Sequence, residues 1–208
     1  MKFAGLLTLV LLTACSNIPR QDSEPFAPHP LLEPWHSWQF SGRISIRTEA
    51  NGWFAGLRWL QSGDRYQLYI QGPFGQGAVE VVGDGEYVRL RAGDGRIYVD
   101  RDAESLIYQV LGVKVPVAGL RYWVHGLSDP GQPEQSRWNR EGVRSELRQA
   151  GWIIHYQKYV SVADRRLPTK IRMENKELQI RLQIDNWQKG APDIPRIRSA
   201  LTVFSNSI

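Results

Sequence analysis

The chain has 208 residues, which is enough for one large domain or two small ones. Hydrophobic residues make up 42% of it and charged residues 23%, a balance that excludes a disordered chain and a polytopic membrane protein. Lysine and arginine number 26 against 21 aspartates and glutamates, which gives a net charge of +5. Cys15 is the single cysteine, so an intramolecular disulfide and a cysteine-rich metal site are both excluded.

The first fifteen residues predict export from the cytoplasm. Met1 and Lys2 precede an apolar run over residues 3–12, which is too short to span a bilayer and is typical of a secretory signal peptide. The run leads into Leu-Thr-Ala-Cys, which resembles the lipobox of bacterial lipoproteins. We therefore expect residues 1–14 to be a signal peptide and Cys15 to carry N-acyl and S-diacylglycerol groups. The alternative is a buried first helix in which the cysteine is incidental.

The expected lipid would anchor the protein permanently at a membrane. Ser16 follows Cys15, and in the enterobacterial sorting rule an aspartate at this position retains a lipoprotein in the inner membrane. Serine therefore favours the periplasmic face of the outer membrane. An exported protein is a poor candidate for nucleic-acid binding, so its positive charge suits acidic lipid headgroups or an acidic partner surface better.

Proline marks the next segment, residues 15–34, as a tether between the lipid and the folded body. Five of the twelve prolines fall here: Pro19, Pro25, Pro28, Pro30 and Pro34. The last part of this region, with the residues that follow it to Trp38, could form a short helix before the first strand. The tether would let the body stand away from the membrane.

The body, residues 35–188, alternates apolar and polar residues with a period of two, which predicts many half-buried strands. Asp-Gly pairs at Asp84-Gly85 and Asp94-Gly95 indicate hairpins. The alternative, calcium-binding loops, would need more carboxylates than these loops contain. The expected inward residues are Ile44, Ile46, Trp53, Ala55, Leu57, Trp59, Tyr66, Leu68, Ile70, Val79, Val81, Val88, Leu90, Ile97, Val99, Trp152, Ile154, Tyr156, Ile171, Met173, Leu178, Ile180, Leu182 and Ile184.

Two helices interrupt the strands. Residues 102–111 carry apolar side chains at helical spacing, with Asp102 as the N-cap and Gly112 as the terminator. Pro116 opens a second helix at its first position, and Gly126 ends it. A sheet of this length must curl or close, and the inside of a half-closed barrel offers the apolar surface that the helices need. Residues 189–208 show no strand pattern and are expected to be a loosely held C-terminal tail.

Catalytic motifs are missing from the sequence. It shows no histidine pair for zinc, no Gly-x-Ser-x-Gly elbow and no phosphate loop or dinucleotide fingerprint. We therefore expect no catalytic residue, no metal and no cofactor beyond the lipid on Cys15. Eight tryptophans remain, which either fill a core or line a cavity for acyl chains.

The loop Gly72-Pro73-Phe74-Gly75 joins two predicted strands and holds a large apolar residue with no charge beside it. Hairpin tips usually prefer polar residues. Phe74 either folds back onto the sheet or is exposed to dip into a bilayer or a hydrophobic partner. Burying it would contribute roughly 1.5–3 kcal/mol, enough to bias membrane contact but too little to fix it.

The combined pattern resembles the LolB family of outer-membrane lipoprotein receptors, collinearly over about residues 35–188. The resemblance rests on the order of these motifs: the lipobox, Asp64-Arg65-Tyr66 leading into Gly72-Pro73-Phe74-Gly75, Asp102-Ala103-Glu104, Leu120 to Leu127, and Asp185-Asn186-Trp187. It implies an unclosed antiparallel β-barrel with helices forming a lid over an apolar cavity. The candidate cavity residues are Trp59, Leu68, Trp123, Trp152 and Trp187.

The resemblance also implies a function. A monomer would accept lipoproteins from the soluble periplasmic carrier LolA, hold their acyl chains, and place them in the inner leaflet of the outer membrane without ATP. The family has an apolar residue, usually leucine, at the tip of a membrane-insertion loop, and Pro73, Phe74 and Gly75 occupy that place here. Two rival classes remain: an envelope-assembly lipoprotein with a packed barrel that binds another protein, and an envelope hydrolase with polar residues inside its cavity.

Overall fold

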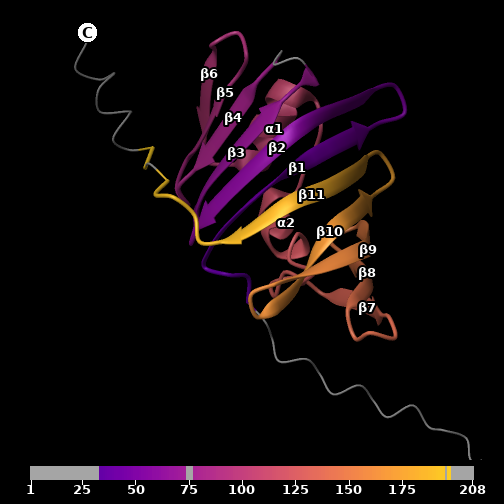
Figure 1. Cartoon of the computed structure of the whole chain (residues 1–208). Helices are drawn as coiled ribbons and strands as arrows, with labels where there is room; N and C mark the ends of the chain where they lie inside the picture. The colour runs from indigo at the N-terminus through magenta and orange to yellow at the C-terminus, as the bar shows by residue number, and fades with distance from the viewer. Residues whose placement is uncertain (1–32, 74–76, 195, 198–208) are drawn as a thin grey trace, which may run out of the picture. The chain divides into compact units, whose positions relative to one another are not determined.

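Antiparallel strands form one sheet that curves around two helices in the computed structural model, which describes residues 33–73, 77–194, 196 and 197 (Figure 1). The strands before the helices are β1 (Ser37–Arg47), β2 (Gly52–Ser62), β3 (Arg65–Gln71), β4 (Val79–Gly83), β5 (Val88–Arg91) and β6 (Ile97–Asp100). The helices are α1 (Ala103–Leu111) and α2 (Val117–Trp123). The later strands are β7 (Glu134–Trp138), β8 (Arg144–Gln149), β9 (Trp152–Val162), β10 (Arg165–Glu174) and β11 (Gln179–Lys189).

The sheet consists of two meanders joined through their first and last strands. The strand order is β6-β5-β4-β3-β2-β1-β11-β10-β9-β8-β7, so β1 pairs with β11 at the centre of the sheet. Strands β6 and β7 follow one another in the chain but form opposite edges of the sheet. Among the described residues they do not pair with each other. The sheet is therefore an unclosed barrel, and the segment that carries both helices connects its two edges (Figure 1).

The alternation of side chains gives the sheet an apolar inner face. In β11 the side chains of Ile180, Leu182 and Ile184 are buried, whereas the intervening Arg181 is exposed. The helices present Leu106, Ile107 and Trp123, among others, to the same hydrophobic cluster. Each strand therefore has one face in a core beneath the helices and one face turned outward, as the period-two pattern predicts.

A β-bulge interrupts the pairing of β1 with β11: Ser41 pairs with Asn186 and Gly42 with Ile184, so Asp185 is the extra residue and β11 is the bulged strand. The backbones approach so closely that a Cβ on Gly42 would lie 2.1 Å from the carbonyl oxygen of Gln183. Only glycine fits this position without moving one of the two central strands.

The helix ends match the sequence signals, with one shift. The carboxylate of Asp102 accepts hydrogen bonds from the backbone nitrogens of Glu104 and Ser105, and Gly112 ends α1 in the left-handed region at φ 70°. The sequence predicted Pro116 as the first helical residue of α2, but in the structure Pro116 is the N-cap. Its φ of −75° suits a helix but its ψ of 83° does not, so the helix begins one residue later.

Three expectations about the strands are wrong. Residues 33–36 are not helical, and Trp38 belongs to β1, where it pairs with Lys189 and places its indole in the core. The strand β7 was not predicted, because most of its side chains are exposed and it shows no alternation of buried and exposed residues. Outward placement of Ile97 and Val99 in the edge strand β6 also differs from the prediction.

The segment after β11 is held more firmly than the expected loose tail. Ile194 and Ile197 are 0% and 2% exposed and pack with Leu60 and Val82 in a second, smaller hydrophobic cluster. Arg65 donates hydrogen bonds to Asp193 and to the carbonyl of Ile194, and the backbone nitrogen of Ile197 donates to Asp84. The remainder of the tail, from residue 198, lies outside the described residues. Among the described helices, neither is long and apolar enough to cross a membrane.

Candidate functional site

The five predicted cavity residues come together on the inner face. Trp59, Leu68, Trp123, Trp152 and Trp187 are all buried, and all belong to one hydrophobic cluster. Trp59 and Leu68 are direct cross-strand partners on β2 and β3. Trp123 projects from α2 and lies 6.2 Å from Trp152 between ring centroids. All five side chains therefore lie inside the fold, packed beneath the helices, and their role in holding acyl chains stays a prediction.

An aromatic cluster at one end of this interior was largely missed from the sequence. Its centre is Trp38, which is 0% exposed and whose ring centroid lies 5.3 Å from Trp59 and 5.6 Å from Trp187. Phe40 and His125 complete it, with centroids 5.9 Å and 4.7 Å from that of Trp38. The signal was the Trp-x-Phe alternation in β1, which the glycine at the bulge separates from the later alternation of Ile44 and Ile46.

The indole nitrogens of this interior differ in their hydrogen bonding. Trp59 Nε1 donates to Gln61 Oε1 at 2.9 Å, and Trp187 Nε1 donates to the carbonyl of Pro168 at 2.8 Å. Trp38 Nε1 is buried and has no hydrogen-bond partner among the described residues. A buried donor without a partner is unfavourable, by roughly 1–3 kcal/mol, so the packing of the cluster must outweigh this term.

His125 is a buried titratable group in the same cluster. Burial lowers its pKa to about 3, against a smaller opposing effect of its hydrogen bond with the carbonyl of Arg121, while the nearby charge of Arg165 lowers the pKa further. Its Nδ1 lies 3.1 Å from that carbonyl oxygen, and because a carbonyl only accepts, Nδ1 carries the proton. The imidazole is therefore neutral and acts as part of the apolar interior.

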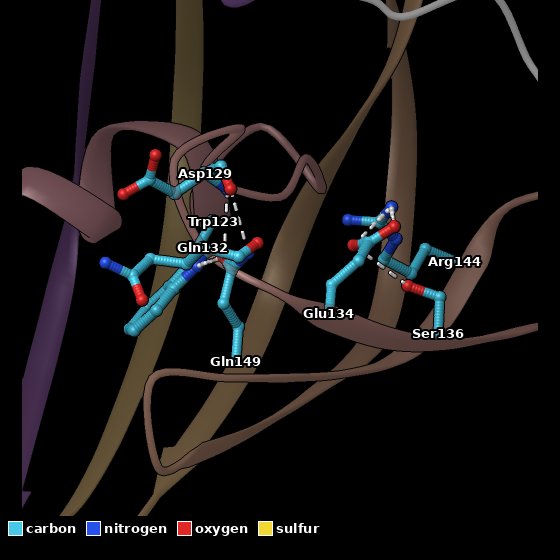
Figure 2. A network of polar contacts seen from close by, with 7 residues as sticks. All are labelled: Trp123, Asp129, Gln132, Glu134, Ser136, Arg144 and Gln149. Carbon is cyan, nitrogen blue, oxygen red and sulfur yellow. Dashed lines mark hydrogen bonds and ion pairs between the residues drawn. The ribbon is translucent and has the colours of Figure 1, made fainter.

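A polar lock holds α2 against the second meander (Figure 2). Gln149 of β8 is buried, and its Oε1 accepts hydrogen bonds from Trp123 Nε1 and from the backbone nitrogen of Asp129, each at 2.8 Å. Its Nε2 donates to the carbonyls of Asp129 and Gln132 at 2.9 and 3.0 Å. One buried amide is thus fully satisfied and fixes both the end of α2 and the loop that follows it.

A neighbouring ion pair secures the edge of the sheet (Figure 2). The guanidinium of Arg144 is buried and lies 3.2 Å from the carboxylate of Glu134 on the adjacent edge strand. Arg144 also stacks over the ring of Trp138 at 5.0 Å, and its carbonyl accepts a hydrogen bond from Tyr159. These contacts fix the edge strand that follows the helical segment.

The other predicted site residues have different outcomes. Pro73 is described and exposed at the end of β3, whereas Phe74 and Gly75 of the same loop lie outside the described residues. The lipidation candidate Cys15, the signal peptide over residues 1–14, and the tether up to residue 32 also lie outside them. Within the described ranges, no group of three or more histidine, cysteine, aspartate or glutamate side chains could hold a metal ion.

Comparison with known proteins agrees with the fold. The chain is 37% identical over 193 residues to an outer-membrane lipoprotein LolB of Nitrosococcus oceani, covering 89% of this chain and 96% of that protein. It is 35% identical over 198 residues to the outer-membrane lipoprotein LolB of Cellvibrio japonicus, covering 89% of this chain and 97% of that protein.

Among solved structures, a LolA superfamily protein of Nitrosomonas europaea superposes with a TM-score of 0.51 at 10% identity. The superposition covers 79% of this chain and 90% of that one, and it shows a shared fold. Residues 36–187 match the family described as outer membrane lipoprotein LolB, which is most of the described sheet and both helices. By this match and by its relatives, the chain belongs to the LolB family of outer-membrane lipoproteins.

Proposed function

We propose that the protein is an outer-membrane lipoprotein receptor that accepts lipoproteins from a LolA-type periplasmic carrier and inserts them into the inner leaflet of the outer membrane. The observation that carries the proposal is the continuous apolar face of an unclosed barrel, covered by two helices, in a chain of the LolB family. The protein would act at the periplasmic face, attached by acyl groups on Cys15, and as a monomer.

The physical basis is a downhill transfer of acyl chains. Each buried methylene contributes about 0.8 kcal/mol, so a diacylated cargo cannot cross water unaided. The inner face offers aliphatic and aromatic side chains and few charges: His125 is neutral there, and the amides of Gln61 and Gln149 are hydrogen-bonded. Binding and release need no covalent step, so we propose a non-enzymatic function and no cofactor.

In the described state the inner face is packed against the helices, so cargo must displace them. The route is through the open side of the barrel, between β6 and β7, which α1 and α2 cover. Since acyl chains would replace helix side chains on the inner face, the environment of Trp123 and Trp152 would change on loading.

The same packing supports one alternative, an envelope-assembly lipoprotein whose barrel is a filled core and binds another protein. Every one of the five cavity candidates is buried by neighbouring side chains, as a filled core requires. The two functions differ in whether the interior opens, which a transfer assay measures directly.

The test uses a form that begins at Ser16 and therefore lacks the lipid anchor. Residues 1–15 lie outside both the family match and the described fold, so this form keeps every contact reported above. Carrier loaded with a radiolabelled lipoprotein is mixed with this form and then with liposomes. The receptor function predicts movement of label to the protein and on to the liposomes, with a change in tryptophan fluorescence at the first step.

Variants of Phe74 separate acceptance from delivery. Phe74→Glu should accept cargo but deliver it poorly, whereas Phe74→Leu, the matched apolar control, should deliver it as the unaltered protein does. If the unaltered protein takes no cargo from the carrier, the receptor function is wrong and the packed-barrel alternative stands.

A further inference from the structure

A basic groove lies on the outer face of the sheet, opposite the apolar interior. It has a volume of about 940 Å³ and is lined mainly by β1, β2, β10 and β11, with Gly72 and Pro73 at its rim. Arg43, Lys170, Arg172 and Arg181 line it, and no aspartate or glutamate is among its lining residues. Each of these cations alternates with an inward residue such as Ile44, Ile171 or Leu182, which places the cations on the outward side.

The register of the sheet gathers these cations into two cross-strand rows. One row runs from Arg172 through Arg181 and Ser45 to Phe54. The other runs from Lys170 through Gln183 and Arg43 to Gly56 and Gln71. Gly56 has no side chain and leaves space in the floor of the groove, where an added Cβ would lie 3.7 Å from the carbonyl oxygen of Gln71, an ordinary contact.

The charge of the groove is only partly neutralised by the protein. Arg43 pairs with Asp185 at 3.0 Å, and Arg172 Nε lies 3.6 Å from Glu174. Neither Lys170 nor Arg181 forms an ion pair with any described residue. Arg172 and Arg181 are direct cross-strand partners, and like charges in that position are destabilising. This unfavourable arrangement indicates that the groove is suited to an anion.

An exposed aromatic residue distinguishes between possible anions. Phe54 is 69% exposed and stands at the end of the row that holds Arg172 and Arg181. Cations beside an exposed apolar side chain are typical of surfaces that lie at a lipid–water interface, where the ring enters the headgroup region and the cations meet phosphates. An acidic protein would use the charges but would leave this ring in water.

We propose that the outer groove binds the phosphate groups of anionic phospholipids at the bilayer surface. Lys170 and Arg181 would meet the phosphates, the hydroxyl of Ser45 and the amides of Gln71 and Gln183 would donate hydrogen bonds, and Phe54 would enter the headgroup layer. Bound in this way, the sheet would rest on the membrane through its outer face while the inner face stays free for cargo. The inference rests on the proposed function only in placing the protein at a membrane.

The experiment measures vesicle binding without carrier or cargo, so its failure is separate from failure of lipoprotein transfer. The form beginning at Ser16 is sedimented with phosphatidylcholine vesicles and with vesicles that also contain phosphatidylglycerol. Lys170→Gln/Arg181→Gln removes two groove charges. Arg137→Gln/Arg140→Gln removes two exposed charges near the β7 edge and is the matched control. Gly56→Glu adds a carboxylate to the groove floor without removing any contact.

The proposal predicts binding that needs phosphatidylglycerol and weakens with salt. Binding should be roughly thirtyfold weaker in the groove variant, which lacks two cations, since each cation near an anionic surface contributes on the order of 1 kcal/mol. Gly56→Glu changes the charge by one unit and should weaken binding roughly fivefold, and the control variant should stay within about twofold of the unaltered protein. Inorganic phosphate at equal charge concentration should compete poorly, because binding depends on the array of headgroups.

Three results would overturn the proposal. Binding to phosphatidylcholine alone with equal strength would show that charge plays no part. An equal loss in the Arg137→Gln/Arg140→Gln control would show that total charge, not the groove, is responsible. Unaltered vesicle binding by the groove variant, with impaired transfer from the carrier, would assign the groove to an acidic protein partner instead.

Discussion

The two faces of the sheet use the same strands for opposite purposes. The inner face carries Trp38, Phe40, Trp59 and Trp187 in van der Waals contact, whereas the outer face of the same central strands carries arginine, lysine and glutamine around an open groove. The inner face is closed and satisfied by packing, and the outer face retains a pair of adjacent arginines with no strong internal compensation. Side chains on the inner face therefore contribute to stability, and those on the outer face are available for binding.

The largest expected difference between buried and rim positions is in tryptophan removal. Trp38→Ala should lower the free energy of unfolding by about 3–5 kcal/mol, because it empties the centre of the aromatic cluster. Trp53→Ala is the matched control: Trp53 has the same strand parity as Trp59 but is 47% exposed, so its loss should be roughly 1 kcal/mol or less. Urea denaturation measures both, and equal losses would contradict the distinction.

The neutral state of His125 makes the inner face sensitive to acid. The folded-state pKa is about 3 and the unfolded value is near 6.5, so below pH 6.5 the unfolded chain binds a proton that the folded protein does not. Stability from this group is therefore complete above pH 6.5 and is lost as the pH falls toward 3, by about 1.4 kcal/mol per pH unit.

The measurement is the unfolding free energy between pH 7 and pH 4.5, compared with His125→Asn. The asparagine amide can keep the hydrogen bond to the Arg121 carbonyl but does not titrate. We expect the variant to be less stable at pH 7 but to show a flatter pH dependence. Parallel slopes for the two proteins would mean that His125 is not the source of the acid sensitivity.

The polar lock on α2 should have an intermediate effect. Gln149→Leu removes all four hydrogen bonds of the amide and leaves Trp123 Nε1 without its acceptor, so we expect a loss of about 1–3 kcal/mol. Gln132→Leu is the control, because only its backbone carbonyl takes part. Hydrogen exchange should also show faster opening of α2 in the first variant alone, and uniform protection would contradict the role of the lock.

The smallest effect, and the one opposite in sign, is expected on the outer face. Arg181→Gln relieves repulsion with Arg172, so the free energy of unfolding should stay the same or rise by roughly 0.5 kcal/mol. Arg148→Gln removes an outward arginine that is paired with Glu146 at 2.8 Å, so it should lower stability by a few tenths of a kcal/mol, roughly. Thermal unfolding at low salt compares the pair, and a clear loss in Arg181→Gln would give that arginine a structural role.

The sequence predicted local features well because they depend on neighbouring residues. The alternation in β11 identified its buried face, Asp102 and Gly112 marked the ends of α1, and the resemblance to a family supplied the unclosed barrel. The five cavity candidates were also gathered into one interior.

Features that depend on long-range pairing were not predicted. The residues up to Trp38 were expected to form a possible short helix. The burial of Trp38 depends instead on the pairing of β1 with β11, and these strands are far apart in the chain. The burial of Ile194 and Ile197 needs a surface made by Leu60 and Val82, and no local pattern signals such contacts. The outer groove was not predicted either. In the sequence its arginines occupy ordinary outward positions of separate strands, and only the register of the sheet brings them side by side.

The path of the chain between β6 and β7 has a mechanical consequence. These strands are the two free margins of the sheet, and residues 101–133 are the covalent bridge between them, with both helices inside the bridge. If β6 and β7 move apart, the connecting segment must extend. If the helices move away from the sheet, the same segment must change its path between the two edges. Opening of the interior and a change in the curvature of the sheet are therefore coupled. A displacement of either edge strand is transmitted to the aromatic cluster through α2 and His125.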